Sequence, residues 1–223
     1  QTAAAAWLDL YVSGSANTGA ITQSDAAAAS VNIFSDDATF SINQSAAGAS
    51  ATVGITGSDN TGADITQTAD GTAALVIAGT SNVAGAILQE ADGQIADVEI
   101  TGNSNYSDID QGANADNASA TVIFSGDGNY GSIVQSAADT TANSDISGSE
   151  NAYVITQDAA GASATLDIDG DYNAVNTINQ TGNGTLTSAT LAVSGSNNLS
   201  SAISQAATGQ VAVVAISGDA NTT

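Results

Sequence analysis

Apolar and polar residues alternate along this chain in short runs, and the same run returns ten times. With few exceptions each copy reads Ala-x-Φ-x-Φ-x-Gly-x-x-Asn, where Φ is a large apolar residue, and nine copies close with Ile-x-Gln. An apolar residue at every second position is typical of a β-strand with one dry face. The closing Gln returns every 21 to 25 residues, a period that indicates a stack of similar short units.

One unit illustrates the reading. Apolar residues alternate over residues 51–55, and residues 57–60, Gly-Ser-Asp-Asn, form a turn that tolerates left-handed backbone. Alternation resumes over residues 63–67, and residues 68–71 lead through a second turn into the next unit. Each unit is therefore predicted to be strand, turn, strand, turn, which is one β-arch.

Aligned units place the same residue types in the same columns. We predict that the Ile column fills the core, because no acid occurs in it. Its members are Ile21, Ile42, Ile65, Ile87, Ile109, Ile133, Ile155, Ile178 and Ile203. We predict that turn Asn and closing Gln residues form amide ladders along the stack. These ladder residues are Asn17, Gln23, Gln44, Gln67, Gln89, Asn105, Gln111, Asn129, Gln135, Asn151, Gln157, Gln180 and Gln205.

The two strands of a unit must face each other, and most units pair a large residue with a small one. The pairs are Leu10 with Gly19, Val53 with Ala63, Leu75 with Gly85, Val98 with Ser107 and Val122 with Gly131. The seventh unit inverts the order, so Tyr153 is predicted to point inward over Ser144. The units with Asn60, Asn82, Asn173 and Asn198 carry one extra residue before Gln. We expect a turn or a β-bulge to absorb it.

The predicted fold is all-β, a β-solenoid of two-strand β-arch repeats with about 22–23 residues each. It forms one domain over residues 1–223, with nine complete repeats and a half repeat at 212–221. A lone unit buries about three large side chains, worth about 1.5–3 kcal/mol each. Ordering its backbone costs about 1–2 kcal/mol per residue, so the units must stack. The apolar strands at 8–12 and 211–216 show no polar cap and would template another copy in a cross-β fibre.

Composition narrows the function. The chain has no Lys, Arg, His, Cys or Pro and a net charge of −23. Nothing can neutralise phosphates, which excludes nucleic acid as a partner, and anionic membrane surfaces are disfavoured. The sequence contains no run of about 18 apolar residues, so no segment is predicted to span a membrane. No nucleophile or base beyond scattered carboxylates is available, so we predict no enzyme, no catalytic residue and no cofactor. The chain has no Lys or Arg to form the basic start of a signal peptide, so it is expected to be a mature form from which such a peptide has been removed.

Some possible functions of the surface residues stay open. Oxygen-rich turns suit Ca²⁺, which leaves weak surface Ca²⁺ binding as a possibility, but the calcium-binding nonapeptide is absent and no metal site is assigned. The turn acids concerned are Asp59, Asp127, Glu150, Asp171 and Asp219. Tyr106 and Tyr130 follow the turn Asn in successive units and should stack on the outer face. Ice binding needs a regular Thr array, and the outward column around Thr52 and Thr121 is too mixed to form one.

At this point the chain resembles the curlin-repeat family of bacterial curli subunits. That pattern, Asn with a small residue two later and Gln six later, is met by residues 17–23, 105–111 and 129–135, and its Asn and Gln also by Asn151 with Gln157. The resemblance implies a secreted functional amyloid of the biofilm matrix. Three features depart from the family: an Ile, Val or Phe column replaces its second inward Gln, the repeats are more numerous than the familiar five, and basic residues are missing.

The functional hypothesis is a structural subunit of an extracellular bacterial amyloid fibre that polymerises head to tail with itself, for matrix scaffolding, adhesion and surface protection. Its secretion and nucleation partners are not identified by the sequence. The alternatives are a non-polymerising secreted β-solenoid adhesin and the minor nucleator of such a fibre. Residues 1–6 of one subunit are expected to complete the half coil at 212–221 of its neighbour.

Overall fold

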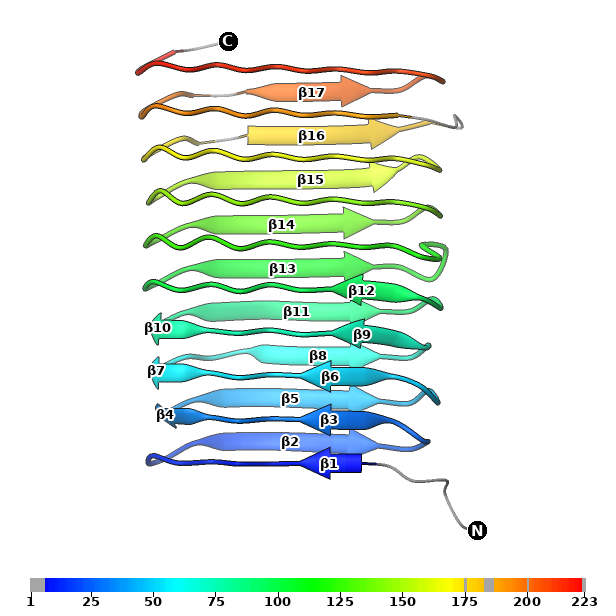
Figure 1. Cartoon of the computed structure of the whole chain (residues 1–223), viewed down its shortest axis with the longest axis vertical. Helices are drawn as coiled ribbons and strands as arrows, with labels where there is room; N and C mark the ends of the chain where they lie inside the picture. The colour runs from blue at the N-terminus through cyan, green and yellow to red at the C-terminus, as the bar shows by residue number, and fades with distance from the viewer. Residues whose placement is uncertain (1–6, 175, 183–186, 200, 222–223) are drawn as a thin grey trace.

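The chain is a β-solenoid in which the repeats stack along one long axis (Figure 1). A computed structural model describes residues 7–174, 176–182, 187–199 and 201–221. All regular elements in these ranges are strands, and every strand pair is parallel. None of the described residues form a helix that could cross a bilayer. The expectation for residues 1–6 lies outside the described residues.

The second half of each repeat forms a continuous parallel sheet of nine strands, called here the closing sheet. Its register pairs Ile with Ile and Gln with Gln in successive repeats, as in Ile109–Ile133 and Gln111–Gln135, which confirms the alignment of the columns. The strands are β2 (Thr18–Gln23), β5 (Thr39–Gln44), β8 (Ala63–Gln67), β11 (Val83–Gln89), β13 (Tyr106–Gln111), β14 (Tyr130–Gln135), β15 (Ala152–Asp158), β16 (Asn176–Thr181) and β17 (Ala202–Gln205).

The first half of each repeat, called here the opening row, is less regular than predicted. Short strands occur only toward the N-terminal half. They are β1 (Trp7–Asp9), β3 (Ala28–Ser30), β6 (Ser50–Thr52), β9 (Gly71–Ala73) and β12 (Gln94–Ala96), with β4 (Phe34–Asp36), β7 (Thr56–Ser58) and β10 (Ala78–Thr80) before the turns. Later described rows meet through isolated bridges such as Ser119–Thr141. Left-handed residues interrupt the extended backbone there, including Ile123 at φ 115° and Phe124 at φ 95°.

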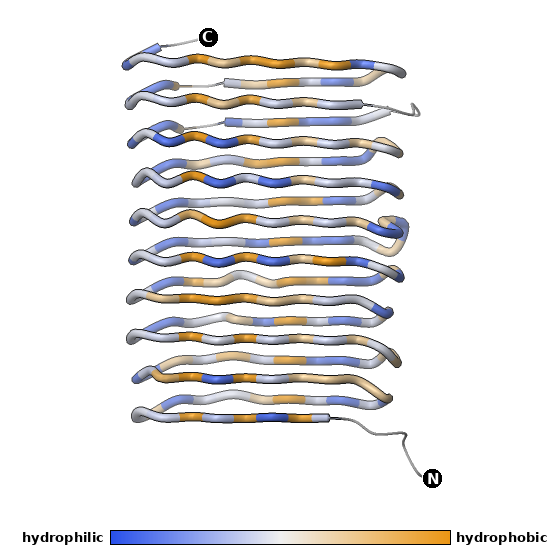
Figure 2. Tube along the Cα trace, viewed as in Figure 1, coloured by the Kyte–Doolittle hydropathy of each residue, from blue (hydrophilic) through white to orange (hydrophobic). Residues whose placement is uncertain are grey.

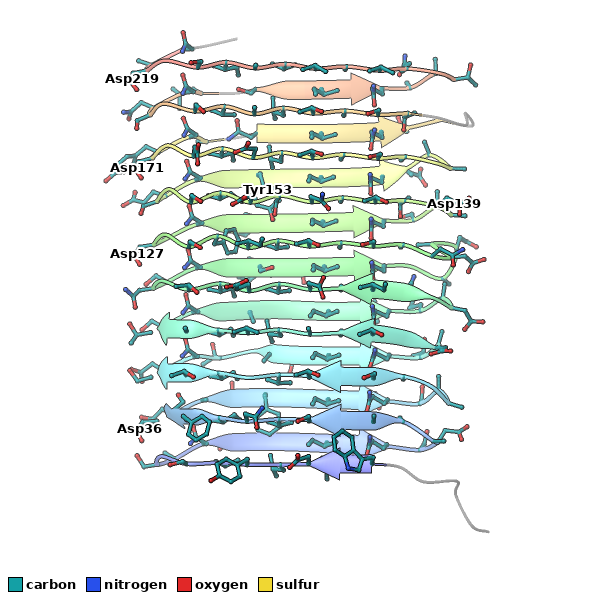
Figure 3. The ribbon with its side chains drawn as sticks, viewed as in Figure 1. Asp36, Asp127, Asp139, Tyr153, Asp171 and Asp219 are labelled. Carbon is teal, nitrogen blue, oxygen red and sulfur yellow. The ribbon has the colours of Figure 1, made fainter. Side chains whose placement is uncertain are left out.

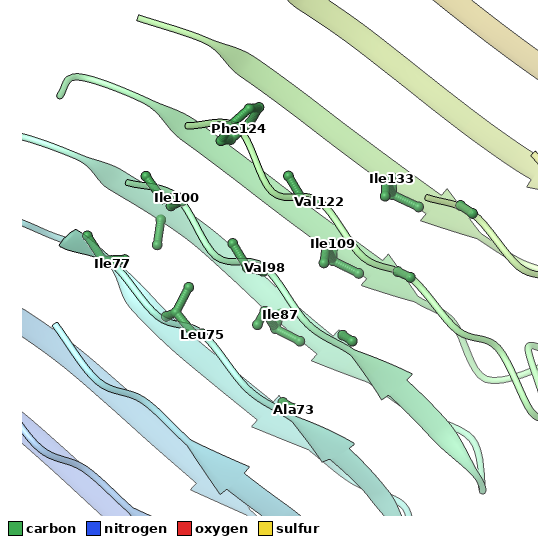
Figure 4. Packing of buried hydrophobic residues seen from close by; sticks show 14 of the residues in the cluster. Ala73, Leu75, Ile77, Ile87, Val98, Ile100, Ile109, Val122, Phe124 and Ile133 are labelled. Atoms are coloured by element: carbon green, nitrogen blue, oxygen red, sulfur yellow. The ribbon is translucent and has the colours of Figure 1, made fainter. Parts of the chain in front are cut away.

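The core lies between the closing sheet and the opening rows. Apolar and polar residues alternate along each row (Figure 2), and the inward set is buried. Figure 4 shows Leu75, Val98 and Val122 of the opening rows in the same layer as the closing-sheet isoleucines. The predicted Ile column is buried from Ile42 to Ile203, whereas Ile21 in the first repeat is only partly buried.

Tyr153, labelled in Figure 3, points into the core as predicted. It is 1% exposed, and its hydroxyl donates to Ser144 Oγ at 3.0 Å. Burial raises the pKa of this phenol well above its usual range. Space for the ring also comes from the repeat before it, because a Cβ on Gly131 would lie 2.4 Å from the Tyr153 ring. Small residues thus provide space for a large side chain both in the facing strand of its own repeat and in the neighbouring repeat.

The extra residues are absorbed in two ways. In β11 the register shifts between Ala84 and Ile87, which is the expected bulge. The predicted inward position of Gly85 is wrong, because Ala84 is buried and pairs with Ser107. Ala84 and Gly85 are both small, so side-chain volume could not show which of the two points inward. In the preceding repeat the extra Gly62, with φ 75°, comes before the inward Ala63.

Candidate functional site

The closing Gln residues form an unbroken chain of side-chain hydrogen bonds. Nε2 of each Gln donates to Oε1 of the Gln in the next repeat, in eight bonds of 2.7 to 3.0 Å. From Gln67 to Gln205, Nε2 also donates to a carbonyl of the opening row, as from Gln67 to Ser50 at 2.8 Å and from Gln111 to Ile95 at 2.8 Å. Each of these amides therefore joins two repeats and both halves of the core. Every Gln from Gln44 to Gln205 is buried.

This Gln ladder has a direction. All eight donors point toward the C-terminal end of the stack. Within the described residues, Oε1 of Gln23 ends the ladder as an acceptor and one Nε2 proton of Gln205 ends it as a donor. The two ends of the Gln ladder are therefore complementary to each other.

The turn Asn residues form a second, oppositely directed ladder. Asn82 shows the pattern: its backbone N–H and Nδ2 donate to Asn60 Oδ1 at 3.0 and 3.1 Å, and Nδ2 also donates to Gly102 O at 2.8 Å. The predicted ladder residues Asn105, Asn129 and Asn151 join this column. The structure adds the members Asn60, Asn82, Asn173, Asn198 and Asn221. Their place three residues after the turn Gly or Ser was the available signal.

The Asn ladder breaks once, in the second repeat. Ala38 stands where the other repeats have Asn, and only its backbone N–H reaches Asn17 Oδ1, at 2.9 Å. Asn17 and Gln23, in the first repeat, are half-buried where the later ladder residues are buried. The Gln ladder thus forms throughout, the Asn ladder is interrupted at Ala38, and both ladders are least enclosed at their beginning.

A third ladder, not predicted, runs along the exposed first turns and is called here the turn ladder. In seven of the nine pairs of neighbouring repeats, the residue after the turn Gly or Ser35 accepts a bond from the backbone N–H of the same position one repeat earlier, the exceptions being Asp36–Ser58 and Ser58–Thr80. Ser149 donates to Asp171 Oδ1 at 2.8 Å, Asp171 to Ser196 Oγ at 3.2 Å, and Ser196 to Asp219 Oδ1 at 2.8 Å. Figure 3 shows Asp171 and Asp219 along one edge of the stack. A column of short polar side chains was its sequence signal.

Hydrogen bonding perturbs an acid at the start of this edge. The backbone N–H and hydroxyl of Ser15 both donate to Asp36 Oδ1, at 2.6 and 2.8 Å. These bonds lower the pKa of Asp36, the backbone bond having the larger effect. The turn acids thus act as acceptors between repeats. Among the described residues, no three or more acidic side chains gather as a metal centre would require.

The turn glycines are required by the close approach of neighbouring repeats. A Cβ on Gly126 would lie 1.9 Å from Gly148 O, and a Cβ on Gly170 would lie 1.6 Å from Gly195 O. Such contacts forbid a side chain in that direction. Ser35 occupies this column in the second repeat, buried, with its hydroxyl donating to Asp36 O at 3.1 Å.

Sequence reasoning also missed a buried amide near the second turn. Gln94 Nε2 lies within hydrogen-bond distance of the carbonyls of Gln111, Gly112 and Ala115, at 3.0 to 3.2 Å. Its Oε1 accepts from Ala91 N at 3.1 Å. Gln94 therefore supports the turn that follows Gln111, which is longer than most.

The two ends of the stack expose inward-facing apolar residues. Leu8, Leu10 and Val12 are 49%, 49% and 48% exposed, whereas Val31 and Ile33 in the next repeat are fully buried. At the other end the inward Val214 and Ile216 are only partly covered. Another rung of the same pattern would enclose these side chains.

Comparison with known proteins adds no relative. No family model, no curated protein and no solved structure matches the chain, so none of these comparisons identifies a curlin-repeat protein or any other family.

Proposed function

We propose that this protein is a structural subunit of an extracellular bacterial fibre in which copies add head to tail. The observation that carries the proposal is the complementarity of the two ends of the stack. One end offers the Gln23 acceptor and the other the Gln205 donor, and both ends leave inward apolar residues partly exposed. The amyloid character and the biofilm location are what the resemblance to curlin repeats implies, self-association is what the uncapped repeats suggest, and all three belong to this proposal.

The energetics favour a copy of the same chain as the added rung. Covering the exposed halves of Leu8, Leu10 and Val12 contributes roughly 1 kcal/mol per side chain. Parallel strands and a one-way Gln ladder accept only a rung of the same direction, so the fibre would be polar. The charge of −23 per copy opposes growth. Added salt, Ca²⁺ or a pH near 4 should therefore accelerate polymerisation.

The test uses purified full-length protein, imaged by negative stain and examined by fibre diffraction. Fibres with a meridional reflection near ~4.8 Å support the proposal. Two variants of one rung provide a matched pair, because Val214 faces inward and Val213 is 69% exposed on the outer face. Val214→Asp should slow elongation at least tenfold, whereas Val213→Asp should elongate like the parent, with both folded by circular dichroism. Discrete soluble particles under all conditions, or normal growth of Val214→Asp, would contradict the proposal.

A second candidate is the non-polymerising secreted adhesin. Exposed aromatic rings favour it: Trp7, Tyr11 and Phe34 are 59%, 61% and 51% exposed, and the Tyr11 and Phe34 rings lie 5.6 Å apart. Analytical ultracentrifugation separates the two candidates, because a stable monomer at high concentration favours the adhesin.

A further inference from the structure

The outer face of the closing sheet, called here the closing face, is the most regular surface of the molecule. It is built by outward residues of nine adjacent strands in one parallel ladder. Among the described outward positions before the closing Gln, the only acids are Asp64, Asp108 and Asp110. Most other acids lie in the turns that border this face. The closing face is therefore broad and sparsely charged, with a charged rim.

An aromatic pair lies midway along the stack on the closing face, beside the turn Asn residues where its two strands begin. Tyr106 in β13 and Tyr130 in β14 stack with ring centroids 4.8 Å apart and planes 5° from parallel, as predicted for successive units. Tyr130 is 46% exposed. Four strands lie on one side of this pair and three on the other. The same column continues with small or β-branched residues, Val83 before the pair and Ala152 after it.

The size of this face fits a stable protein interface. Nine strands at ~4.8 Å and about six residues at ~3.3 Å each span roughly 40 Å by 20 Å. That is about 800 Å² per partner, the area of a standard specific interface. Tyrosine is also enriched among the residues that carry most of the binding energy of such interfaces.

We propose that two copies of this chain pack closing face against closing face, with the Tyr106–Tyr130 pair midway along the contact. A second copy suits the surface because a flat, sparsely charged face can be self-complementary. The acidic turns would then stay on the rim in water, as polar rims of interfaces do. In a fibre this pairing makes the filament two solenoids wide, a consequence that rests on the proposed function, whereas the pairing itself does not.

Charge sets the conditions for pairing. Sheets pack about 10 Å apart, so rim acids of the two copies approach within about one Debye length at 0.1 M salt. Asp108 sits beside Tyr106 and Asp110 on the face, and its Oδ1 accepts from Ala86 N at 2.9 Å. Burial raises the pKa of Asp108, and pairing would remove more of its water. The paired state therefore binds this proton more tightly, and association should strengthen with salt and with falling pH.

Sedimentation velocity of the full chain, with filament mass per length, tests the pairing. Ser132→Glu puts a charge beside Tyr130 on the closing face, and Ser163→Glu is the matched change on an outward position of an opening row. We expect pairs in the parent at 0.15–0.5 M salt, at least tenfold weaker association in Ser132→Glu and in Tyr130→Ala, and parent-like association in Ser163→Glu. Asp108→Asn should associate more tightly near neutral pH.

The outcomes separate this proposal from the head-to-tail fibre. Pairs without filaments would support the pairing and count against the fibre. Filaments one solenoid wide, with a parent that sediments as a monomer before growth, would overturn the pairing and leave the fibre standing. Equal effects of Ser132→Glu and Ser163→Glu would also overturn it, because they would show general repulsion instead of a specific face.

Discussion

The Gln ladder and the turn ladder share one design and differ in their surroundings. In both, side-chain oxygens accept hydrogen bonds from the neighbouring repeat, without a break in the Gln ladder and with a break at Ser58 and Thr80 in the turn ladder. In the interior, where a lone donor or acceptor has no water, only Gln occupies the position from Gln23 to Gln205. At the surface, water can replace a missing partner, and the column varies among Ser, Thr, Asn and Asp. The tolerance of a ladder therefore follows its burial.

The turn ladder has a constraint of its own, which is charge. Its members in order are Ser15, Asp36, Ser58, Thr80, Asn103, Asp127, Ser149, Asp171, Ser196 and Asp219. Asp never occupies this column in two successive repeats. Carboxylates one strand spacing apart, ~4.8 Å, would repel by about 1 kcal/mol even in water. Alternation with uncharged acceptors keeps the ladder while avoiding that repulsion.

The largest expected effect comes from breaking the Gln ladder at its centre. Gln135→Leu removes the acceptor of Gln111 and the donor to Gln157, so two buried groups lose partners. We expect destabilisation of about 2–5 kcal/mol, concentrated in the adjoining repeats. Hydrogen exchange resolved along the chain measures it. Uniform protection in Gln135→Leu would contradict the importance given to the buried ladder.

A buried bond outside the ladders should give an intermediate effect. Tyr153→Phe keeps the ring but leaves Ser144 Oγ without its bond of 3.0 Å. We expect a loss of about 1–2 kcal/mol, measured from urea unfolding. Tyr153→Phe combined with Ser144→Ala removes both polar groups and should recover part of that loss. Failure of the double variant to recover would mean that packing matters more than the hydrogen bond.

The exposed turn ladder should be far less sensitive. Ser149→Ala removes the hydroxyl that accepts from Asp127 N at 3.2 Å. We expect a loss of about 0.5–1 kcal/mol, the cost of a missing cap. It is measured by the same hydrogen exchange as Gln135→Leu. A loss equal to that of Gln135→Leu would end the contrast between the two ladders.

The smallest effect has the opposite sign. Burial, Asp169 and Asp145 together raise the pKa of Asp167 on the outer face. A carboxyl whose folded pKa is raised binds its proton more tightly when folded, so stability rises as pH falls through that pKa toward 3.8. Asp167→Asn should therefore stabilise the fold at pH 7 by a few tenths of a kcal/mol and flatten this rise. Thermal unfolding at several pH values tests both the stabilisation at pH 7 and the weaker pH dependence. A variant less stable than the parent at pH 7 would contradict the raised pKa of Asp167.

Much of the fold was predictable because the repeats reinforce one another. Period-two alternation, repeated in ten copies, predicts the inward columns, the Gln ladder and the inward Tyr153. The irregular opening rows were not predictable, since Ile123 and Phe124 ordinarily favour extended backbone and here have positive φ. The turn ladder was missed because four residue types serve the same purpose there. Gln94 was missed because its partners are backbone carbonyls, which leave no sequence pattern.

The two turns of each repeat accept change very differently. The first turn always takes three residues from its Gly or Ser35 to the Asn or Ala38 position, and its backbones nearly touch. The second takes nine residues from Gln111 to Ala120 but seven from Gln89 to Ala96, and the stack keeps its register across both. A foreign peptide inserted between the exposed residues Ala113 and Asn114 would thus be displayed once per molecule, and an array of such molecules would carry it at regular intervals.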